Sequence, residues 1–433
     1  MEENQAHIPE GWHLKQIQEF ALKMRSGGTP KSDNPKYYNG NIPFVAIDDL
    51  TSANKYLEKT QKHITKEGLN NSAAWLVPIN TIMYSIYATL GVPRINLVEA
   101  ATNQAILNII PDENKITLEF LFYLLLEKRS SILSHSAHTT QSNLNAKIVK
   151  ELEFVFPKKT TEQTQIATVL SKVDEAITKT EQLIAKYARI KTGLMQDLLT
   201  KGIDENGNIR SEETHEFKDS PLGRIPNEWE VKRLDQITKS NSPIVYGILM
   251  PGKHFFGGVP VIKVKDIFDE KIHIEGLLHT NPVIADSFKR SKLKENDLLF
   301  TIRGTVGRCA FVPNELDGAN ITQDTARIRV QDEYKDYLRF TFETPESQYY
   351  IQLNTIGQAV KGINLKALRE LNVLIPPPIE AGIIAKELNT SNNLIDVESL
   401  ELSKLQSLKT GLMQDLLSGK VRVNHLIKET ASV

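Results

Sequence analysis

The chain has 433 residues, which predicts two or three domains at roughly 100 to 200 residues per domain. Apolar residues make up 40% of it and charged residues 24%, a composition typical of globular proteins that excludes collagen-like and wholly disordered chains. Basic and acidic side chains number 52 and 53, so the formal net charge is -1 and any attraction to nucleic acid must come from local basic patches.

The cellular location is predicted from three absences. The single cysteine, Cys309, excludes an internal disulfide framework and a zinc site built from cysteines, and it suits a reducing compartment. The first residues, Met1 to Asn4, carry acid where a secretory signal needs base, and the longest apolar run, Leu121 to Leu126, is far shorter than a membrane span. We therefore expect a cytoplasmic protein that makes no membrane contact.

The first segment, residues 1–158, is expected to form a globular domain of mixed α/β (α+β) structure. Short β-rich runs such as Phe44–Ile47 and Phe154–Phe156 are separated by Gly and Pro, and a helical stretch at Leu118–Lys128 interrupts them. The segment lacks the regular alternation of strands and helices that is typical of a doubly wound parallel sheet.

Residues 159–200 predict one long amphipathic helix. Pro157 ends the preceding strand, and Thr160 with Gln163 has the spacing of a capping box. Apolar residues then recur at helical spacing, at Ile166, Val169, Leu170, Val173, Ile177, Leu183, Ile184, Tyr187, Ile190, Leu194 and Leu198. Glycine, asparagine and charged residues follow, so we expect an exposed linker at residues 201–220.

The rest of the chain repeats the first part. Ile8-Pro9-Glu10-Gly11-Trp12 reappears as Ile225-Pro226-Asn227-Glu228-Trp229, and Lys191–Leu199 returns letter for letter as Lys409–Leu417. Such identity at the same place in each half indicates a tandem duplication. We therefore expect a second domain at residues 221–377, a second long helix at residues 378–418, and a short tail at residues 419–433.

Neither predicted helix can bury its apolar stripe alone, and two such helices in one duplicated chain can pair. A pseudo-twofold axis relating the halves would make the pair antiparallel, and the heptad-like spacing favours a coiled coil. At 1.5 Å per residue, a helix of about 39 residues is roughly 58 Å long, so the pair would act as a spacer between the two domains. The alternative is that each helix packs only on its own domain.

Motifs that resemble catalytic sites are incomplete in this sequence. Asn34–Tyr37 is similar to the loop with which adenine methyltransferases grip a flipped base, but Lys36 replaces a proline, so a turn is the better explanation. Pro111–Lys115 contains the letters of a metal-dependent nuclease signature without the strand needed to bring two carboxylates to one magnesium ion. His135 and His138 lack a third metal ligand. We expect no catalytic residue, metal or cofactor on this chain.

The candidate DNA contacts are polar and basic residues at matching loop positions of the two halves. Arg303–Arg308 combines glycines, which let the backbone approach a groove, with two arginines that can make bidentate contacts to guanine. Its counterpart, Tyr87–Gly91 followed by Arg94, carries different side chains. The complete set is Tyr87, Thr89, Arg94, Thr139, Thr140, Gln141, Asn143, Lys289, Arg290, Lys292, Arg303, Thr305, Arg308, Gln358 and Lys361.

Three members of that set have a specific expected chemistry. Gln141 and Asn143 have side-chain amides that can grip an adenine edge, and Lys361 can bind a phosphate or a guanine. The cationic run Lys289–Lys294 can neutralise phosphates, although a solvated charged surface explains that run equally well.

These features together resemble the specificity (S) subunit of type I restriction-modification enzymes, over nearly the whole chain. The residues that carry the resemblance are Ser26–Pro30, Asn34-Pro35, Asn39-Gly40, Ile42–Ile47, Phe217–Trp229, Gly304–Gly307, Thr322–Thr325, and the two Lys-Thr-Gly-Leu-Met-Gln-Asp-Leu-Leu helix ends. The second half has Tyr246–Pro251 where the first has Gly-Gly-Thr-Pro, which favours a structural turn over base contact for that string.

The resemblance implies two target recognition domains, an antiparallel coiled coil and no catalytic activity in the subunit itself. It also implies assembly with two modification subunits, which bind S-adenosylmethionine and methylate adenine, and with two restriction subunits, which use ATP and magnesium to translocate and cut DNA.

Our interpretation is that each domain reads one half of an asymmetric, bipartite site in double-stranded DNA, while the helices set the gap and dock the modification subunits. Two alternatives stay open. One is a self-sufficient, duplicated DNA-modifying enzyme with an unrecognised active site, and the other is a purely structural coiled-coil scaffold.

Overall fold

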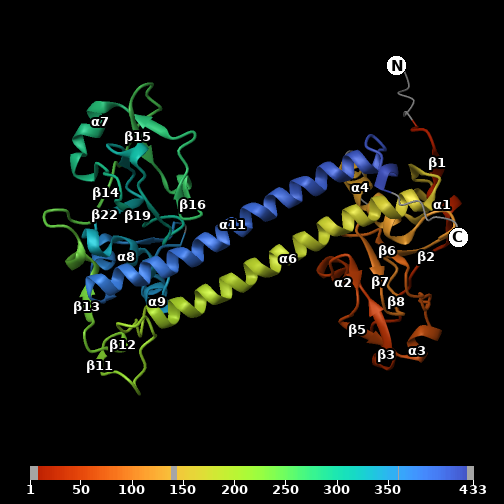
Figure 1. Cartoon of the computed structure of the whole chain (residues 1–433), viewed down its shortest axis with the longest axis horizontal. Coiled ribbons are helices and arrows are strands. Elements are labelled where there is room, and N and C mark those ends of the chain that lie inside the picture. Colours follow the sequence, from red (N-terminus) through yellow and green to blue (C-terminus); the bar gives the residue numbers. More distant parts are fainter. Residues whose placement is uncertain (1–7, 138–143, 359, 427–433) are drawn as a thin grey trace. The chain divides into compact units, whose positions relative to one another are not determined.

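The computed structural model describes residues 8–137, 144–358 and 360–426. The chain divides into two compact units: unit 1 comprises residues 1–181 and 400–433, and unit 2 comprises residues 182–399. Two long helices, α6 (Thr160–Leu198) and α11 (Pro378–Leu417), each contribute one half to either unit (Figure 1). None of the helices in the described ranges has the length and apolar character of a membrane span.

Unit 1 contains a five-stranded sheet with strand order β2-β9-β6-β7-β4 and a three-stranded sheet with order β5-β3-β8. A separate antiparallel ribbon pairs β1 with β10. The strands are β1 (Trp12–Gln16), β2 (Ala21–Ser26), β3 (Tyr38–Val45), β4 (Tyr56–Leu57), β5 (Lys62–Ile64), β6 (Ile82–Ser85), β7 (Pro93–Asn96), β8 (Ala101–Thr102), β9 (Ile106–Pro111) and β10 (Glu153–Pro157). The helices besides α6 and α11 are α1 (Ile17–Phe20), α2 (Ile47–Ser52), α3 (Lys66–Asn70), α4 (Leu118–Ala137) and α5 (Ala146–Lys150).

Unit 2 contains a four-stranded sheet with order β14-β22-β19-β20 and a three-stranded sheet with order β18-β15-β21, together with several two-stranded ribbons. The strands are β11 (Phe217–Ser220), β12 (Gly223–Pro226), β13 (Glu230–Arg233), β14 (Val245–Tyr246), β15 (Val259–Ile262), β16 (Ile267–Phe268), β17 (Lys271–Ile272), β18 (Leu278–Thr280), β19 (Leu298–Thr301), β20 (Cys309–Phe311), β21 (Asn320–Ile321), β22 (Thr325–Ile328), β23 (Thr355–Ile356), β24 (Gly362–Ile363) and β25 (Asn372–Ile375). The helices are α7 (Pro282–Ser287), α8 (Lys335–Thr341), α9 (Pro345–Asn354) and α10 (Leu365–Glu370).

The two units repeat one topology. Strand β6 pairs antiparallel with β9 and β7, and β19 pairs antiparallel with β22 and β20. In each unit a short parallel pair, β3 with β8 or β15 with β21, builds the second sheet. The central strands β6 and β19 are buried along their whole length, which explains why they are mostly apolar runs rather than alternating patterns. The predicted mixed α/β class and the internal duplication are therefore confirmed.

The long helices run antiparallel where they meet within unit 1. Asp174 of α6 forms an ion pair with Lys409 of α11 at 2.6 Å, and Glu162, near the start of α6, pairs with Arg422, just beyond α11, at 2.7 Å. Residue numbers rise along one helix as those of its partner fall, so the chain directions oppose. Ile166 and Leu170 at the start of α6 share a core with the end of α11, at Leu412, Met413, Leu416 and Leu417.

Unit 2 has the reciprocal arrangement. Ile384 and Leu388 at the start of α11 share a core with Leu198 and Leu199 at the end of α6. The start of each helix thus packs on its own domain, while its end packs against the other helix. The expectation that the helices pair is confirmed. The alternative, that each helix packs only on its own domain, holds for the start of each helix and not for its end.

The capping box expected at the start of α6 is wrong. Thr160 is already a helical residue, and the side chain of Gln163 is fully buried and bonded elsewhere. Its Nε2 donates to the carbonyls of Lys115 and Pro157 at 2.9 Å, and its Oε1 accepts from the N–H of Thr117 at 2.8 Å. Gln163 therefore connects α6 to the start of α4, a tertiary role that competes with the local cap.

The end of each long helix is closed by a glycine and a buried carboxylate. In unit 2, Glu380 accepts from the N–H of Ile203, from both terminal guanidinium nitrogens of Arg210, and from Nε1 of Trp229. Gly202 turns the chain there at a φ of 65°, and a Cβ on it would lie 2.1 Å from the Glu380 carboxylate. The stretch expected to be an exposed linker is therefore attached to unit 2 through Ile203 and Arg210, while most of its residues are exposed as expected.

Unit 1 has the matching cluster at the end of α11. Glu162 accepts from Nε and Nη2 of Arg422 at 2.7 and 3.0 Å. Gly419 turns the chain at a φ of 73° against Trp12, the counterpart of Trp229. Nε1 of Trp12, however, is buried without a hydrogen-bond partner among the described residues. The two clusters thus share their residue types. They differ in the donors that bond the carboxylate: Ile203, Arg210 and Trp229 bond Glu380, whereas Arg422 bonds Glu162.

Candidate functional site

Each unit contains a six-residue loop with the same hydrogen bonds, and we call these two loops the matched loops. In unit 1 the loop is residues 86–91, directly after β6. The hydroxyl of Ser85 accepts from the N–H of Val92 at 2.9 Å and donates to the carbonyl of Thr89. The N–H of Gly91 donates to the carbonyl of Ser85 at 3.0 Å. One buried serine therefore holds both ends of this loop.

The loop of unit 2 is residues 302–307, directly after β19. The hydroxyl of Thr301 accepts from the N–H of Arg308 at 2.9 Å and donates to the carbonyl of Thr305 at 2.6 Å. The N–H of Gly307 donates to the carbonyl of Thr301 at 3.0 Å. Every hydrogen bond of the unit 1 loop has a counterpart here, so the backbone scaffold is the same.

The matched loops also share their backbone conformation. Ala88 and Gly304 occupy the same position, with φ values of 60° and 75°, and Gly91 and Gly307 occupy another, with φ values of 74° and 98°. These left-handed conformations favour glycine, so the presence of alanine at position 88 indicates that the hydrogen bonds impose the conformation.

The tips of the matched loops carry different side chains. Tyr87 stands where unit 2 has Arg303, and both are exposed, Tyr87 by 39%. The guanidinium of Arg303 makes no hydrogen bond or ion pair with any residue in the described ranges. Thr89 and Thr305 also occupy one position, with their carbonyls used in the loop and their side chains at its surface. A phenol and a guanidinium are thus presented on one scaffold.

In unit 2 the matched loop lies beside two other segments that carry candidate residues. The N–H of Gly304 donates to the carbonyl of Lys361 at 2.9 Å, and Arg303 forms an isolated antiparallel bridge with Gly362. On its other side, the N–H of Arg303 donates to the carbonyl of Asp324 at 3.2 Å. The structure therefore brings Lys361 next to Arg303 and Thr305, from which it is far in sequence, at one edge of unit 2.

That edge continues to the segment after β14. Gln323 N–H donates to the carbonyl of Ile248 at 3.0 Å, and the N–H of Gly247 donates to the carbonyl of Thr322 at 3.2 Å. A Cβ on Gly247 would lie 1.8 Å from the carbonyl oxygen of Ile321, so only glycine fits. In unit 1 a Cβ on Gly27 would lie 2.0 Å from the carbonyl oxygen of Thr102. The glycine string therefore has a structural role as a close backbone crossing, which differs from the turn that the comparison of the two halves favoured.

Unit 1 builds the same edge, with residues that the sequence did not single out. The N–H of Ile86 donates to the carbonyl of Ala105 at 2.9 Å, which places the matched loop beside the exposed Gln104. The side chains of Gln104 and Thr29 are hydrogen-bonded to each other. Gln323 has the corresponding place in unit 2, and the string Thr322–Thr325 was the sequence signal that pointed to it.

Two predicted arginines have their guanidinium groups directed into the protein. Nε of Arg94 donates to the carbonyl of Ala53 at 2.9 Å, and burial lowers the pKa of Arg94 to about 10. Nη1 of Arg308 donates to the carbonyl of Ile267 at 2.9 Å. Both guanidinium groups are therefore bonded to backbone carbonyls of their own unit, and their remaining donors stay candidates for DNA contact.

A family model for the type I restriction modification DNA specificity domain matches residues 9–187 and 226–407. The chain belongs to this family. The two matched ranges correspond to the two halves of the duplication, so each half is one specificity domain together with most of its long helix.

The specificity domain family includes relatives that align with nearly the whole chain. The putative type I restriction enzyme MjaX specificity subunit of Methanocaldococcus jannaschii is 26% identical over 431 residues, covering 96% of this chain and 95% of its own length. The EcoBI specificity subunit of Escherichia coli is 25% identical over 385 residues, covering 86% of this chain and 77% of its own. The type I restriction-modification S subunit from M. genitalium is similar in fold, with a TM-score of 0.59 at 17% identity, covering 96% of this chain and 97% of its own.

The other predicted contacts of this specificity-domain chain divide into two groups. Thr139, Thr140, Gln141 and Asn143 lie outside the described residues. Lys289, Arg290 and Lys292 are exposed around a single turn of 3-10 helix, and the Arg290 guanidinium lies 5.6 Å from the ring centre of Tyr246, next to Gly247. Gln358 is exposed, near the bridge between Arg303 and Gly362. All of these residues remain candidates.

The motifs that resembled catalytic sites have structural roles. Asn34 Oδ1 accepts from the N–H of Lys36 at 3.1 Å, which makes the expected turn. Asp112 forms an ion pair with Lys115 at 3.1 Å within one loop. Burial raises the pKa of the Cys309 thiol far above its usual range, which suppresses the reactive thiolate. Within the described ranges there is no group of three His, Cys, Asp or Glu side chains that could hold a metal ion.

Proposed function

We propose that the chain reads two different half-sites of an asymmetric, bipartite DNA sequence, one with each unit. The observation that carries this proposal is the pair of matched loops, which combine one hydrogen-bonded scaffold with Tyr87 at one tip and Arg303 at the other. A guanidinium can donate two hydrogen bonds to O6 and N7 of guanine in the major groove. A phenol ring cannot, so the same backbone presents two different recognition chemistries.

The contacts of unit 2 are assigned by chemistry. Arg303 is the guanine reader, Thr305 and Gln358 are polar contacts to bases or sugars, and Lys361 neutralises a phosphate. Arg290 and Lys292 add salt-dependent attraction to the backbone. In unit 1 the corresponding readers are Tyr87 and Thr89, joined by Gln141 and Asn143 for adenine edges.

The long helices are proposed to set the gap between the half-sites. A helix of about 39 residues is roughly 58 Å long, and equivalent major-groove faces recur about every 34 Å along the duplex. A rigid helix pair of this length is sufficient to hold two readers on one face of DNA.

We propose that partner subunits catalyse the methylation and cleavage of DNA, and that this chain catalyses neither reaction. Two modification subunits bind S-adenosylmethionine and methylate an adenine near each reader, which requires the base to be flipped out of the duplex. Two restriction subunits use ATP and magnesium to move along and cut DNA. The proposal is supported by the raised pKa of the Cys309 thiol and by the incomplete catalytic motifs.

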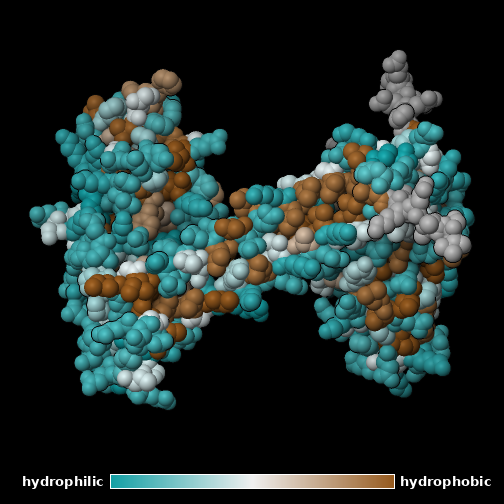
Figure 2. All heavy atoms as spheres, in the orientation of Figure 1, coloured by the Kyte–Doolittle hydropathy of each residue, from teal (hydrophilic) through white to brown (hydrophobic). Residues whose placement is uncertain are grey.

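The exposed side of α11 is the proposed docking face for the modification subunits. Apolar residues lie along the surface of both long helices (Figure 2). In unit 2, Ile379 and Val397 are exposed by 81% and 64%, and in unit 1 Leu400 and Leu408 are exposed by 60% and 51%. Exposed apolar side chains that recur along one side of a helix can form a contiguous apolar surface, which is typical of protein interfaces.

A domain exchange tests the division of labour between the units. Replacing residues 1–157 with the corresponding domain of another family member should change one half of the methylated sequence and leave the other half unchanged. The readout is sequencing of methylated DNA from cells that express the chimera with its modification subunits. A change in both halves would contradict the proposal that each unit reads separately.

The alternative of a self-sufficient DNA-modifying enzyme is separated from this proposal by one assay. The purified chain is incubated with DNA and S-adenosylmethionine in the absence and presence of modification subunits. Methyl transfer only with the partners supports the proposed role, and turnover by the chain alone supports the enzyme. Assembly without any DNA footprint would instead favour a structural scaffold.

A further inference from the structure

Each unit has a short segment that follows a buried aspartate, and we call these two segments the bridging segments. They are residues 50–57 in unit 1, after Asp49, and residues 267–272 in unit 2, after Asp266. Asp49 and Asp266 correspond to each other, because each is buried and accepts a hydrogen bond from the backbone N–H three residues before it. The two bridging segments therefore have the same place in the duplicated fold.

In unit 1 a lysine connects the bridging segment to the long helix. Lys55 belongs to the bridging segment, and its side chain is only 11% exposed. Its Nζ forms an ion pair with Glu119 of α4 and donates to Oγ of Ser171 of α6 at 2.8 Å. The same Nζ lies 4.6 Å from the ring centre of Tyr123. One cation thus contacts an acid, a ring and the long helix.

In unit 2 an arginine makes the same three kinds of contact from a different element. Arg339 lies on α8, and its Nη1 forms an ion pair with Glu270 of the bridging segment. Its Nη2 donates to Oδ1 of Asn389 of α11 at 3.0 Å, and its guanidinium lies 4.5 Å from the ring centre of Phe340. The cation and the anion have therefore exchanged elements relative to unit 1.

The partners of the two cations are at equivalent positions of the two halves. Ser171 corresponds to Asn389, because each follows the buried glutamate of its long helix at the same spacing. The two rings end matching runs, Phe120–Tyr123 of α4 and Tyr337–Phe340 of α8. The polarity of the ion pair thus differs between the units, while the link from bridging segment to long helix is the same.

The bridging segments also contact the parts of the chain that follow the matched loops. In unit 1, β4 of the bridging segment pairs with β7, and the N–H of Ile95 donates to the carbonyl of Lys55 at 3.0 Å. In unit 2, Arg308 directly follows the matched loop, and its Nη1 donates to the carbonyl of Ile267 at 2.9 Å. Each matched loop is therefore linked to a long helix through one bridging segment and one cation.

Such a link restricts how a matched loop can be displaced relative to the long helix. A mostly buried ion pair resists separation, because separation would leave a charge without its partner. Hydrogen bonds to base edges require donor–acceptor distances of about 2.7 to 3.2 Å, so a small tilt of the sheet would move a loop tip out of reach.

We propose that Lys55 and Arg339 are positioning residues, which fix the direction of each matched loop relative to the long helix of its unit. They act through the bridging segments and not by contact with bases. The observation that carries the proposal is the retained cation, which keeps its contacts although the ion pair has the opposite polarity in the two units. This inference rests on the proposed function, because it takes the matched loops as the parts that read bases.

A charge reversal in unit 2 tests the proposal. Arg339→Glu and Glu270→Arg each place like charges together, so each should lower discrimination in the half-site read by unit 2 by about 10-fold, the worth of one lost base contact. The double variant restores an ion pair with the polarity that unit 1 already has, and it should recover most of the discrimination. Lys55→Met should lower discrimination only in the half-site read by unit 1.

Discrimination is measured as a ratio of affinities. The chain, assembled with its modification subunits, binds labelled duplexes that carry its own methylated site or the same site with single base pairs changed in one half. Unfolded molecules bind neither duplex, so a purely structural defect lowers both affinities by one factor and leaves the ratio unchanged. The ratio thus separates positioning from stability.

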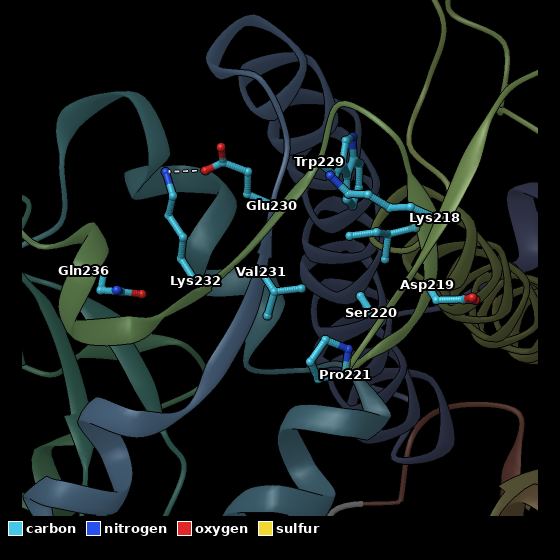
Figure 3. A pocket seen from close by; sticks show the side chains of 10 residues that line it. Lys218, Asp219, Ser220, Pro221, Trp229, Glu230, Val231, Lys232 and Gln236 are labelled. Carbon is cyan, nitrogen blue, oxygen red and sulfur yellow. Dashed lines mark ion pairs between the residues drawn. The ribbon is translucent and has the colours of Figure 1, made fainter.

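Two further variants complete the test. Asn389→Ala removes only the acceptor on α11 and keeps the ion pair, so it should lower the unit 2 ratio by about 3-fold. Lys232→Glu is the control, because it breaks the ion pair between Glu230 and Lys232 within the single strand β13 (Figure 3), and it should leave both ratios unchanged.

The outcomes distinguish this inference from the proposed function. Unchanged ratios in both single variants of unit 2 would overturn the inference, and so would losses that the double variant does not recover. If the unaltered assembly binds its own site and the changed duplexes equally well, the proposed function itself is contradicted, and the inference fails with it.

Discussion

Unit 1 and unit 2 are alike where the chain is hydrogen-bonded and different where it meets solvent. The matched loops keep a hydroxyl at Ser85 and Thr301 and keep the same left-handed positions, while the exposed tip changes from Tyr87 to Arg303. The clusters at the helix ends keep a tryptophan, a glutamate and an arginine. The comparison teaches that a duplicated domain can change its exposed side chains without changing the backbone that presents them, because buried hydroxyl groups fix that backbone.

The largest expected effect is on stability, and it comes from a substitution in the helix-end cluster of unit 2. Glu380→Ala would leave the donors of Ile203, Arg210 and Trp229 without their acceptor, with the Arg210 side chain only 11% exposed. Removing one partner of such a buried pair should lower the free energy of unfolding of unit 2 by about 3 to 5 kcal/mol.

Glu162→Ala is the matched variant in unit 1. It strands only Arg422, whose side chain is 30% exposed and can be hydrated, so a loss of about 1 to 3 kcal/mol is expected. Urea unfolding followed by the fluorescence of Trp12 and Trp229 measures both variants. Equal losses would show that the additional donors around Glu380 contribute nothing.

The second effect is on DNA binding, and it comes from substitutions at the tips of the matched loops. Arg303→Ala should weaken binding to the specific site by about 10-fold or more, because a bidentate guanine contact is worth about 1 to 3 kcal/mol, and should relax the sequence only in the half-site read by unit 2. Tyr87→Ala should affect only the other half-site. Methylation-site sequencing reads both changes.

Lys361→Ala is the control for a contact that carries no sequence information. It should weaken binding to all sequences about equally and reduce the slope of log affinity against log salt by about 1. Unaltered site choice in Arg303→Ala would remove this arginine from the readers, and a relaxed half-site in Lys361→Ala would add the lysine to them.

The third effect tests whether the two loops really share one scaffold. Thr301→Val removes the hydroxyl that bonds Thr305 and Arg308, at an expected cost of about 1 to 2 kcal/mol for the unmade hydrogen bonds. Ser85→Ala should cost a similar amount in unit 1, and Thr301→Ser should restore nearly all of it. Thermal unfolding measures the losses, and unequal costs would mean that the two hydroxyls do not hold their loops in the same way.

Much of this fold could be predicted because the signals were local or repeated. The apolar stripe that includes Ile166 and Leu170 predicted a helix whose observed bounds are Thr160–Leu198, and the string Lys409–Leu417 marked the duplication. The pairing of the helices followed from the need to bury two such stripes.

The remaining features depend on contacts between residues that are distant in sequence. Glu162 and Arg422 form an ion pair although they are far apart in sequence, and no local sequence pattern at either residue predicts this pair. Gln163 was assigned to a local cap because its tertiary partners could not be foreseen. Among candidate readers, Arg303 and Lys361 are neighbours only through a backbone bridge, and Gln104 became a candidate only when its exposure beside the loop was known.

The smallest expected effect concerns His13, whose counterpart in unit 2 is the exposed Glu230. The His13 ring meets the Phe156 ring edge-on at 4.3 Å, and its Nε2 is buried without a described partner. Burial lowers the pKa of His13 below its usual 6.5, assisted by Lys15 and Lys158 and opposed by Glu19. Below pH 6.5 the unfolded chain binds a proton that the folded side chain resists, so this contribution to stability is present above pH 6.5 and is lost as the pH falls.

His13→Asn removes that titration, so the unfolding free energy of unit 1 should fall less between neutral and mildly acidic pH than in the unaltered chain. Urea unfolding at paired pH values measures the difference, and Glu230→Gln provides the control in unit 2, because its side chain is exposed at the equivalent position. An unchanged pH dependence in His13→Asn would mean that the ring reaches water in the folded state. His13 would then be solvent-accessible, as Glu230 is at the equivalent position of unit 2.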